Sequence, residues 1–232
     1  MIPNLASFLD FANHHANATP EEIKQLCRGV LEHGFNSAFV NPVYVPLAHE
    51  LLAGRAKVGA AISFPLGGET RSTKVASCLE AVRSGADELD VVPNLALLLG
   101  DSSGQAFLEE LREIVEAVKQ TKGGTIVKFI LETGYLTPEQ IKLGAKMVAD
   151  AGADFVKFTT GMGPRGASLA DLALVKEAVA GRVKIKVSGG IDTYEEAEAF
   201  INAGANRIGT SHAIEIIKEV PAPVATIQGS AE

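Results

Sequence analysis

Three lysines stand inside short apolar runs, which is an unusual place for an ammonium group. Lys128, Lys157 and Lys186 each have apolar residues on both sides. Burying an unpaired ammonium costs several kcal/mol, so burial lowers the pKa of such a lysine. A lysine that is neutral near pH 7 is a nucleophile toward carbonyl carbon, and Lys157 is our candidate for a Schiff-base lysine. For Lys157 taken alone, a structural ion pair with a carboxylate is an equal alternative.

The neighbouring lysines decide between these alternatives. Three ammonium groups on consecutive buried strands repel one another in a low dielectric, so a purely structural role for the three lysines is disfavoured. A nearby cation lowers the pKa of an amine, and Lys186 is therefore expected to keep Lys157 unprotonated. Asp90 and Glu132 are expected to balance the lysines. Asp90, acting through a water, is also a candidate general acid and base.

Glycine and hydroxyl residues follow three of the expected strands, as Thr159-Thr160-Gly161, Ser188-Gly189-Gly190 and Gly209-Thr210-Ser211. In α/β barrels, bare backbone N–H groups in this region commonly hold a phosphate. One such turn is often only a tight bend, but three in succession favour a binding site. Together with one lysine and one histidine, they give the residues expected to bind substrate: Lys128, Thr159, Gly161, Gly189, Gly190, Gly209, Ser211 and His212.

Strand-like and helix-like segments alternate along the chain and must position these groups. The expected strands cover residues 7–11, 37–40, 58–64, 88–92, 125–131, 154–160, 183–187 and 207–210. One helix is expected to begin after Thr19, and the others cover residues 70–84, 105–120, 137–151, 168–180 and 193–203. Three of the helices open on a threonine followed by Glu or Gln, the chemistry of an N-terminal cap: Thr19, Thr137 and Thr193.

A short turn with a leading glycine precedes every second expected strand, at residues 34–36, 85–87, 152–154 and 204–206. Four βαβα units of this kind close an eight-stranded ring. An open doubly wound sheet usually has a glycine-rich turn after its first strand, whereas residues 10–15 contain no glycine. We therefore predict an α/β fold, a (β/α)8 TIM barrel, as one domain over residues 1–232, with a C-terminal tail at 221–232.

In these residues the chain resembles the 2-deoxyribose-5-phosphate aldolases, a family of class I aldolases. The resemblance covers roughly residues 21–216 and is strongest at 64–67, 87–92, 128–134, 152–157 and 186–191. It implies that Lys157 forms the Schiff base, that Lys186 perturbs the pKa of Lys157, and that Asp90 shuttles protons. It also implies that no metal or other cofactor is needed. The implied reaction joins acetaldehyde to glyceraldehyde 3-phosphate, or cleaves 2-deoxyribose 5-phosphate into them.

The chain departs from the family pattern where the acceptor aldehyde would bind. Asp10-Phe11-Ala12 stands in place of the usual Asp-His-Thr, and Ser211-His212 in place of a common serine pair. Asp192 occupies a position where a basic residue often helps to hold the phosphate, and the tail lacks a tyrosine. A carboxylate beside a phosphate dianion is repulsive unless it turns away or pairs with Arg165. An acceptor without a terminal phosphate is therefore an open alternative.

Other polar residues have plainer interpretations. His14 and His15 follow the first expected strand; adjacent residues of a strand point to opposite sides, and no acidic or histidine cluster completes a metal site around them. One of the two is still a candidate for hydrogen bonding to substrate. Arg165, in a glycine-rich loop, either clamps an anion or is solvated. Cys27 and Cys78 fit two reduced thiols in a cytosolic protein.

Composition limits the partners. The formal net charge of −7 and the pI near 5.3 leave no basic face for nucleic acid or anionic lipid. No apolar run approaches the roughly 18 residues of a membrane span, and no signal peptide is apparent, so a cytoplasmic protein is expected. The expected partner is a small aldehyde or sugar phosphate, and a homodimer is common among relatives. A phosphate-sugar isomerase or decarboxylase, and a non-catalytic metabolite-binding relative, are the weaker alternatives.

Overall fold

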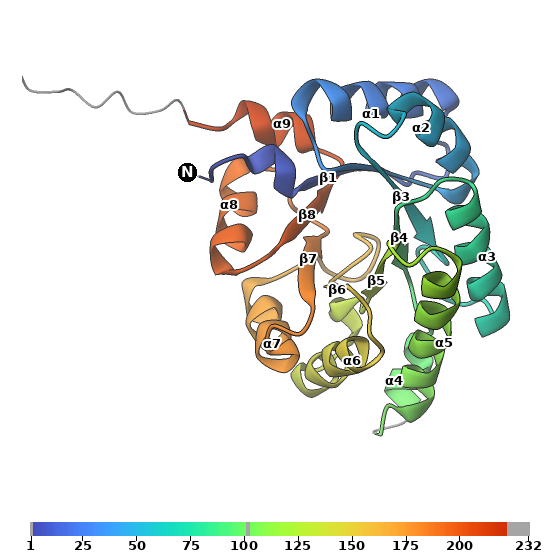
Figure 1. Ribbon diagram of the computed structural model, residues 1–232. Helices are drawn as coiled ribbons and strands as arrows, with labels where there is room; N and C mark the ends of the chain where they lie inside the picture. The colour runs from blue at the N-terminus through green and yellow to red at the C-terminus, as the bar shows by residue number, and fades with distance from the viewer. Residues whose placement is uncertain (1, 101–102, 222–232) are drawn as a thin grey trace, which may run out of the picture.

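The strands of the computed structural model form a closed parallel barrel in chain order (Figure 1), and the structure describes residues 2–100 and 103–221. The strands are β1 (Leu9–Asn13), β2 (Ser37–Val40), β3 (Lys57–Ile62), β4 (Glu88–Val91), β5 (Ile126–Ile130), β6 (Phe155–Lys157), β7 (Lys184–Ser188) and β8 (Arg207–Thr210). This architecture confirms the predicted α/β class and TIM barrel. Of the predicted tail at 221–232, only Pro221 belongs to the described residues.

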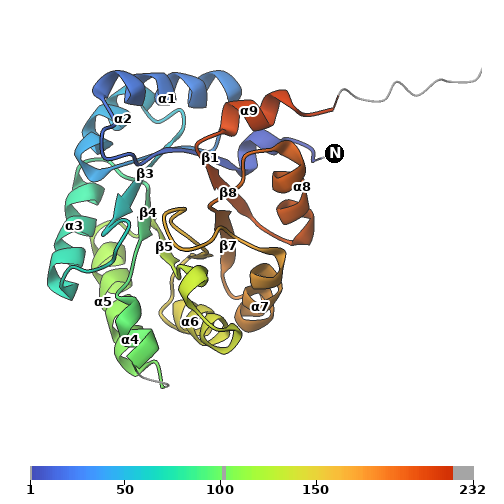
Figure 2. The same ribbon diagram turned by 180° about the vertical axis from the view of Figure 1, so that it is seen from behind.

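Helices surround the barrel on its outer face, as both views show (Figures 1 and 2). They are α1 (Pro20–His33), α2 (Val45–Leu52), α3 (Arg71–Arg83), α4 (Leu95–Gly100), α5 (Gln105–Thr121), α6 (Pro138–Asp150), α7 (Leu169–Val179), α8 (Tyr194–Ala203) and α9 (Ala213–Lys218). The main hydrophobic core fills the layer between strands and helices. None of the described helices combines the length and hydropathy that crossing a bilayer requires.

The predicted helix starts and turns are confirmed by their backbone geometry. Thr19, Thr137 and Thr193 each form a complete capping box with the Glu or Gln three residues later. The glycines of the repeated turn have positive φ values of 70°, 109°, 77° and 115°, a region that side chains disfavour: Gly34, Gly85, Gly152 and Gly204. The repeat in the sequence is therefore a repeat in the fold.

Some elements differ from the prediction. β1 begins at Leu9, two residues later than expected, because Leu5–Phe8 forms a 3-10 turn instead. Three short helices were not predicted: α2, α4 and α9. Each has only six to eight residues, and α2 and α9 lack a side-chain cap, so local sequence carries little signal for them.

The register of the strands brings the predicted reactive residues together. Lys157 of β6 lies opposite Lys186 of β7, and Asp90 of β4 lies opposite Lys128 of β5. All four side chains are buried inside the ring of strands. The parallel barrel thus gathers groups that are distant in sequence into one interior site.

Candidate active site

Lys157 lies at the floor of the open end of the barrel, where its side chain is only 3% exposed. Its Nζ donates a hydrogen bond to Asp90 Oδ2 at 2.8 Å. The pKa of Lys157 is lowered to about 8, first by burial and then by the charges of Lys186 and Lys128. Asp90 acts in the opposite direction and raises it. The predicted environment of a reactive amine is therefore present at Lys157.

Asp90 is the common partner of all three predicted lysines. Its Oδ2 accepts from Lys157 and Lys186, both at 2.8 Å, and its Oδ1 accepts from Lys128 at 3.0 Å. Although burial acts to raise it, these three cations hold the pKa of the Asp90 carboxyl well below its usual range. Asp90 is accordingly an ionised carboxylate that fixes the three amines relative to one another.

A second layer of charged residues, most of which the sequence analysis did not identify, lies beneath Asp90. Asp10 Oδ2 is 2.7 Å from Lys186 Nζ, and Asp10 Oδ1 accepts from Arg207 at 2.8 Å. Glu88 accepts from Lys128 at 2.5 Å and also lies 3.6 Å from Arg207. The Lys186 and Arg207 charges hold the pKa of Asp10 below its usual range despite burial, and Lys128 does the same for Glu88.

The charges around Lys157 act on its protonation state together with burial. Three carboxylates, Asp10, Glu88 and Asp90, face four cations other than Lys157, which are the buried Lys128, Lys186 and Arg207 and the half-exposed Lys57, 3.0 Å from Glu88. A protonated Lys157 would add a fourth buried cation to three buried anions. Loss of its proton lowers this excess of positive charge, and the lone pair that it leaves on Nζ is the feature a Schiff base requires.

An aromatic ring supports two of the lysines from below. Lys186 Nζ lies 3.7 Å and Lys128 Nζ 4.5 Å from the centre of the Phe39 ring. Gly59 on the adjacent strand leaves room for this ring, because a Cβ at that position would lie 2.3 Å from it. The contacts between these cations and the aromatic face help to fix both amines in the apolar interior. Nothing in the sequence marked Phe39 for this position.

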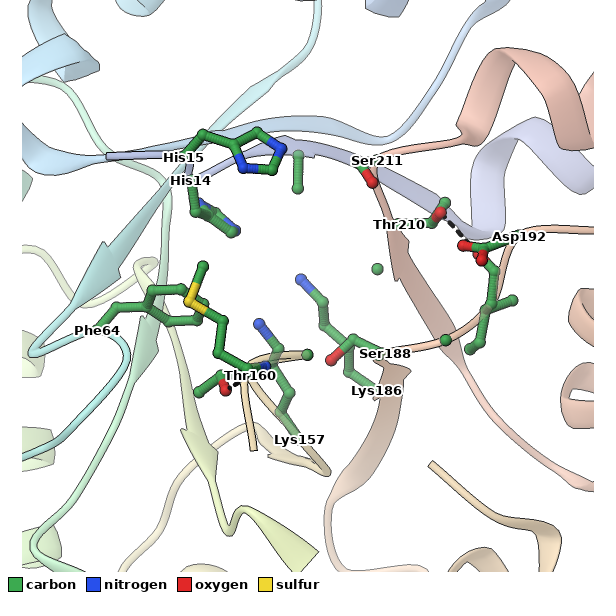
Figure 3. Close-up of a pocket in the computed structure, with 17 residues that line it drawn as sticks. His14, His15, Phe64, Lys157, Thr160, Lys186, Ser188, Asp192, Thr210 and Ser211 are labelled. Atoms are coloured by element: carbon green, nitrogen blue, oxygen red, sulfur yellow. Dashed lines mark hydrogen bonds between the residues drawn. The ribbon is translucent and has the colours of Figure 1, made fainter. Parts of the chain in front are cut away.

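A cavity of about 200 Å³ opens above Lys157 and Lys186 (Figure 3). One side is formed by residues after β1, β3 and β6, including His14, Phe64 and Met162. The other side is the glycine-rich backbone after β7 and β8. Of the predicted substrate-binding residues, five line the cavity: Gly161, Gly189, Gly190, Gly209 and Ser211.

Three predicted binding residues are not on the cavity wall. Lys128 is fully buried beneath it and bound to Glu88 and Asp90. Thr159 is buried, and its hydroxyl donates to the Ser188 carbonyl and accepts from the Gly161 N–H. His212 lies one residue beyond the wall.

Glycine is required in this wall for steric reasons. Gly189 has φ of 89°, and a Cβ on it would lie 2.1 Å from Thr159 Oγ1. A Cβ on Gly209 would lie 2.8 Å from Lys186 Cε. Gly189 leaves the backbone beside the cavity without a side chain, and Gly209 makes room for the side chain of Lys186.

Two expectations about charged residues are corrected by the structure. Glu132 does not balance the lysines: its Oε2 accepts from the backbone N–H of Thr160, at 3.0 Å, and from the hydroxyl of Thr160. Arg165 neither clamps an anion in the cavity nor pairs with Asp192, because its guanidinium is bound to Asp171. Both side chains instead stabilise the loop after β6. The sequence could not reveal these contacts, because neither spacing nor periodicity indicates the partners, Thr160 and Asp171.

At the mouth, Asp192 pairs with a different residue. Its Oδ1 lies 2.9 Å from His212 Nδ1, and both side chains are about half exposed. Asp192 is also one of the residues that line the cavity.

The two adjacent histidines also differ from the expectation. His14 and His15 both line the cavity, because β1 ends at Asn13 and the alternation of a strand no longer applies to them. Among residues 2–100 and 103–221, no group of three or more His, Cys, Asp or Glu side chains is arranged as metal ligands. Cys27 and Cys78 are buried and free of any disulfide, and burial raises the pKa of both thiols, to about 11 and about 12.

A closed (β/α)8 barrel with a buried lysine of lowered pKa below an open cavity is an arrangement typical of Schiff-base enzymes. The sequence profile of the DeoC/LacD family aldolase matches residues 7–214. The chain is 44% identical over 221 residues to deoxyribose-phosphate aldolase of Caldanaerobacter subterraneus subsp. tengcongensis, covering 94% of each chain. This protein belongs to the DeoC/LacD aldolase family.

Solved structures agree with this assignment. A structure named QR15, an aldolase, is 40% identical, with a TM-score of 0.87 over 94% of this chain and 96% of that one. The tetrameric deoxyribose phosphate aldolase from Aeropyrum pernix is 31% identical, with a TM-score of 0.85 over 92% of this chain and 89% of that one. The predicted family is therefore confirmed.

Proposed function

We propose that this protein is a class I aldolase that cleaves 2-deoxyribose 5-phosphate to glyceraldehyde 3-phosphate and acetaldehyde, and catalyses the reverse reaction, without a metal. The observation that carries the proposal is the buried Lys157 amine at the cavity floor, whose pKa is lowered to about 8, chiefly by burial. The family assignment supports the reaction class. The names of the relatives support the substrate.

In the cleavage direction, the Lys157 amine attacks the C1 aldehyde of the open-chain sugar, and loss of water gives an iminium ion. The C3 hydroxyl then loses its proton and the C2–C3 bond breaks. The bonding electrons move into the iminium to give an enamine, and the acceptor aldehyde leaves. Protonation of the enamine at C2 and hydrolysis release acetaldehyde and restore the lysine.

Asp90 and Lys186 are proposed to serve these proton transfers. Asp90 contacts both Lys157 and Lys186, so a proton that leaves either amine has an acceptor within hydrogen-bond distance. Lys186 also lowers the pKa of Lys157. Lys128 contacts Asp90 but not the cavity, and we propose that it positions Asp90 and does not touch substrate.

The phosphate of the substrate is proposed to lie at the opposite end of the cavity from Lys157. Gly161, Gly189 and Gly190 offer unobstructed backbone there, and Ser211 offers a hydroxyl. The Gly161 N–H is already donated to Thr159 Oγ1, so the N–H groups proposed to hold the phosphate are those of Gly189 and Gly190. Backbone N–H groups bind phosphate well without a formal charge.

A second candidate substrate class is an acceptor aldehyde without a phosphate. Asp192 supports it, because this carboxylate lies on the cavity wall and Arg165 is engaged by Asp171. His212 is the neighbour that the Asp192 carboxylate contacts, at 2.9 Å. Comparing kcat/KM for 2-deoxyribose 5-phosphate with kcat/KM for unphosphorylated 2-deoxyribose decides between the two candidates. A preference of less than about tenfold for the ester, or 1.4 kcal/mol, favours the unphosphorylated acceptor.

Trapping the intermediate tests the proposed reaction. Wild-type protein treated with acetaldehyde and borohydride should gain one ethyl group, located on Lys157 by peptide mass spectrometry, with or without a metal chelator. Lys184 begins β7 and is exposed, so Lys184→Met is the matched control that should retain the adduct. An adduct without turnover identifies a non-catalytic binder. No adduct on Lys157 contradicts the proposal and favours an isomerase.

We also propose that the enzyme works in the cytoplasm on a small molecule, as a homo-oligomer. Its acidic net charge of −7 disfavours nucleic acid and anionic lipid. A homodimer is our expectation, whereas the Aeropyrum pernix relative is described as a tetramer. Light scattering coupled to size-exclusion chromatography will give the mass, and a monomer at micromolar concentration would contradict this part of the proposal.

A further inference from the structure

His14 stands at the cavity wall with one ring nitrogen buried and unused. Its ring packs against the Phe64 ring, with centroids 4.9 Å apart, and more distantly against Phe39 at 6.4 Å. Nδ1 is buried and has no hydrogen-bond partner. The side chain nevertheless lines the cavity, so the opposite edge of the ring, with Nε2, is the polar edge available to a ligand (Figure 3).

This imidazole is neutral at physiological pH. Burial and, next, the charge of Lys157 lower the pKa of His14 to about 3. A neutral imidazole carries one N–H and one lone pair. A buried N–H without an acceptor is rarer and less favourable than a buried lone pair, so the hydrogen belongs on Nε2 and the lone pair on Nδ1. His14 therefore presents an uncharged N–H donor to the cavity.

The donor is close to the reacting carbons. The Phe64 ring is shared between His14 and Lys157, whose Nζ lies 5.8 Å from the ring centre. In a Schiff base on Lys157, C1 is bonded to Nζ, and the C3 oxygen lies two carbons further on. A donor on the wall beside Lys157 is thus placed for the oxygen of the bond being made or broken.

We propose that His14 is a catalytic residue that donates a hydrogen bond from Nε2 to the C3 oxygen of the substrate. This rests on the proposed function, because C3 is defined by a Schiff base on Lys157. In synthesis this oxygen is the acceptor carbonyl, which gains negative charge as the C2–C3 bond forms. In cleavage it is the hydroxyl that loses its proton. His14 stabilises the developing charge without exchanging its own proton, and the proton itself passes to the Asp90 relay.

The geometry predicts different outcomes for three substitutions. His14→Phe keeps an aromatic ring and removes the donor, so we expect kcat for cleavage to fall by about 10²-fold, as on removal of one oxyanion donor. His14→Gln can place its amide N–H near the position of Nε2 and should recover much of this loss. His14→Asn places its amide near Nδ1 and should recover little. The loss in His14→Phe should be the same at about pH 6 and pH 8, since His14 does not titrate there.

A second measurement separates catalysis from structure. Borohydride trapping of acetaldehyde on Lys157 involves no C3 oxygen, so its rate should change by less than about threefold in His14→Phe, within about 0.7 kcal/mol. His33, stacked on Phe35 at the end of α1, gives the control His33→Gln, which should match wild type in both assays. Thermal unfolding shows whether each variant is folded.

The outcomes distinguish this inference from the proposed function. Equal losses in trapping and cleavage, or full activity in His14→Phe, would overturn the role of His14 while leaving the aldolase intact. Failure of the wild-type protein to form the Schiff base would overturn the proposed function and this inference with it. A selective loss of cleavage with recovery in His14→Gln supports the inference.

Discussion

The floor of the barrel and its mouth differ in how their polar and charged groups are paired. At the floor, Lys128 and Asp90 are fully buried, and each is held by two or more ionic partners. At the mouth, the wall is mainly glycine backbone and small polar groups, with the half-exposed pair Asp192 and His212 and a buried His14 nitrogen that has no partner. Apart from Arg207 Nε, which is buried without a hydrogen-bond partner, the floor is saturated with interactions, whereas the mouth leaves hydrogen-bonding groups free for a ligand.

This difference separates two tasks. The saturated floor fixes the protonation state of Lys157, because every nearby charge is held in place by strands and cannot rearrange. The unsaturated mouth leaves hydrogen-bonding groups free for a substrate. Changes at the floor should therefore alter reactivity toward all aldehydes, whereas changes at the mouth should alter the choice among them.

Removing the amine should give the largest effect. Lys157→Met should lower kcat/KM by roughly 10⁴-fold or more, because no other group can form the covalent intermediate. Lys184→Met, two residues before Lys186 on the same face of β7 but exposed at the start of the strand, should stay within about twofold of wild type. Steady-state cleavage assays measure both, and comparable losses in the two variants would show that the loss in Lys157→Met is not specific to that amine.

Neutralising the shared carboxylate should come next. Asp90→Asn removes the partner of three lysines, so kcat should fall by roughly 10²- to 10⁴-fold, as on loss of a general acid–base. Asp90 raises the pKa of Lys157, so the rising limb of kcat/KM against pH should move below the wild-type midpoint near 8.

The stability of the same variant gives an independent readout. Leaving buried cations without their partner costs about 3–5 kcal/mol, which denaturant unfolding will detect. An unchanged or raised pH midpoint in the folded variant would contradict the electrostatic role assigned to Asp90.

Removing one cation should shift the pH profile in the other direction. In the wild type, roughly one tenth of Lys157 is free amine at pH 7, given a pKa of about 8. Lys186 lowers this pKa, so Lys186→Met should raise the midpoint of kcat/KM above 8. Part of the activity lost at pH 7 should return at about pH 9, because more amine is deprotonated there. A uniform loss at every pH would mean that Lys186 acts by direct proton transfer alone.

The smallest expected effect lies at the mouth. Asp192→Asn removes a half-exposed carboxylate from the cavity wall, so KM for 2-deoxyribose 5-phosphate should fall by about threefold, less at high salt, with kcat unchanged. KM for unphosphorylated 2-deoxyribose should not change. Glu195→Gln, an exposed carboxylate in the first turn of α8, is the control. Equal effects on both substrates would show that Asp192 acts on the sugar and not on the phosphate.

Much of the floor was predictable from the sequence. Lys157, Lys186 and Asp90 lie in apolar runs whose burial is required by the fold, and the glycine turns fixed the number of strands. Glu88 and Arg207 were missed because their importance depends on which strands become neighbours. A usable signal existed for Glu88: it is two residues before Asp90, so both face the same side of β4.

The mouth was harder to predict, because loops obey no periodicity. His14 and His15 follow the end of β1 at Asn13, so both lie on the cavity wall, against the alternation expected for a strand. Glu132 looked like a partner of the lysines because it follows Lys128 closely, but it has a left-handed backbone conformation and faces the loop after β6. Such partners are set by tertiary contacts and not by spacing.

The ion pair between Asp10 and Arg207 joins the first strand to the last, across 197 residues of sequence. A nascent chain that has not yet made β8 lacks Arg207 and one of the charges that complete the interior. Until the ring closes, Lys157 is accessible to water and keeps the ordinary basicity of a surface lysine. The lowered pKa of Lys157 thus requires a closed barrel. A chain that lacks β8 has the same lysine without its reactivity at neutral pH.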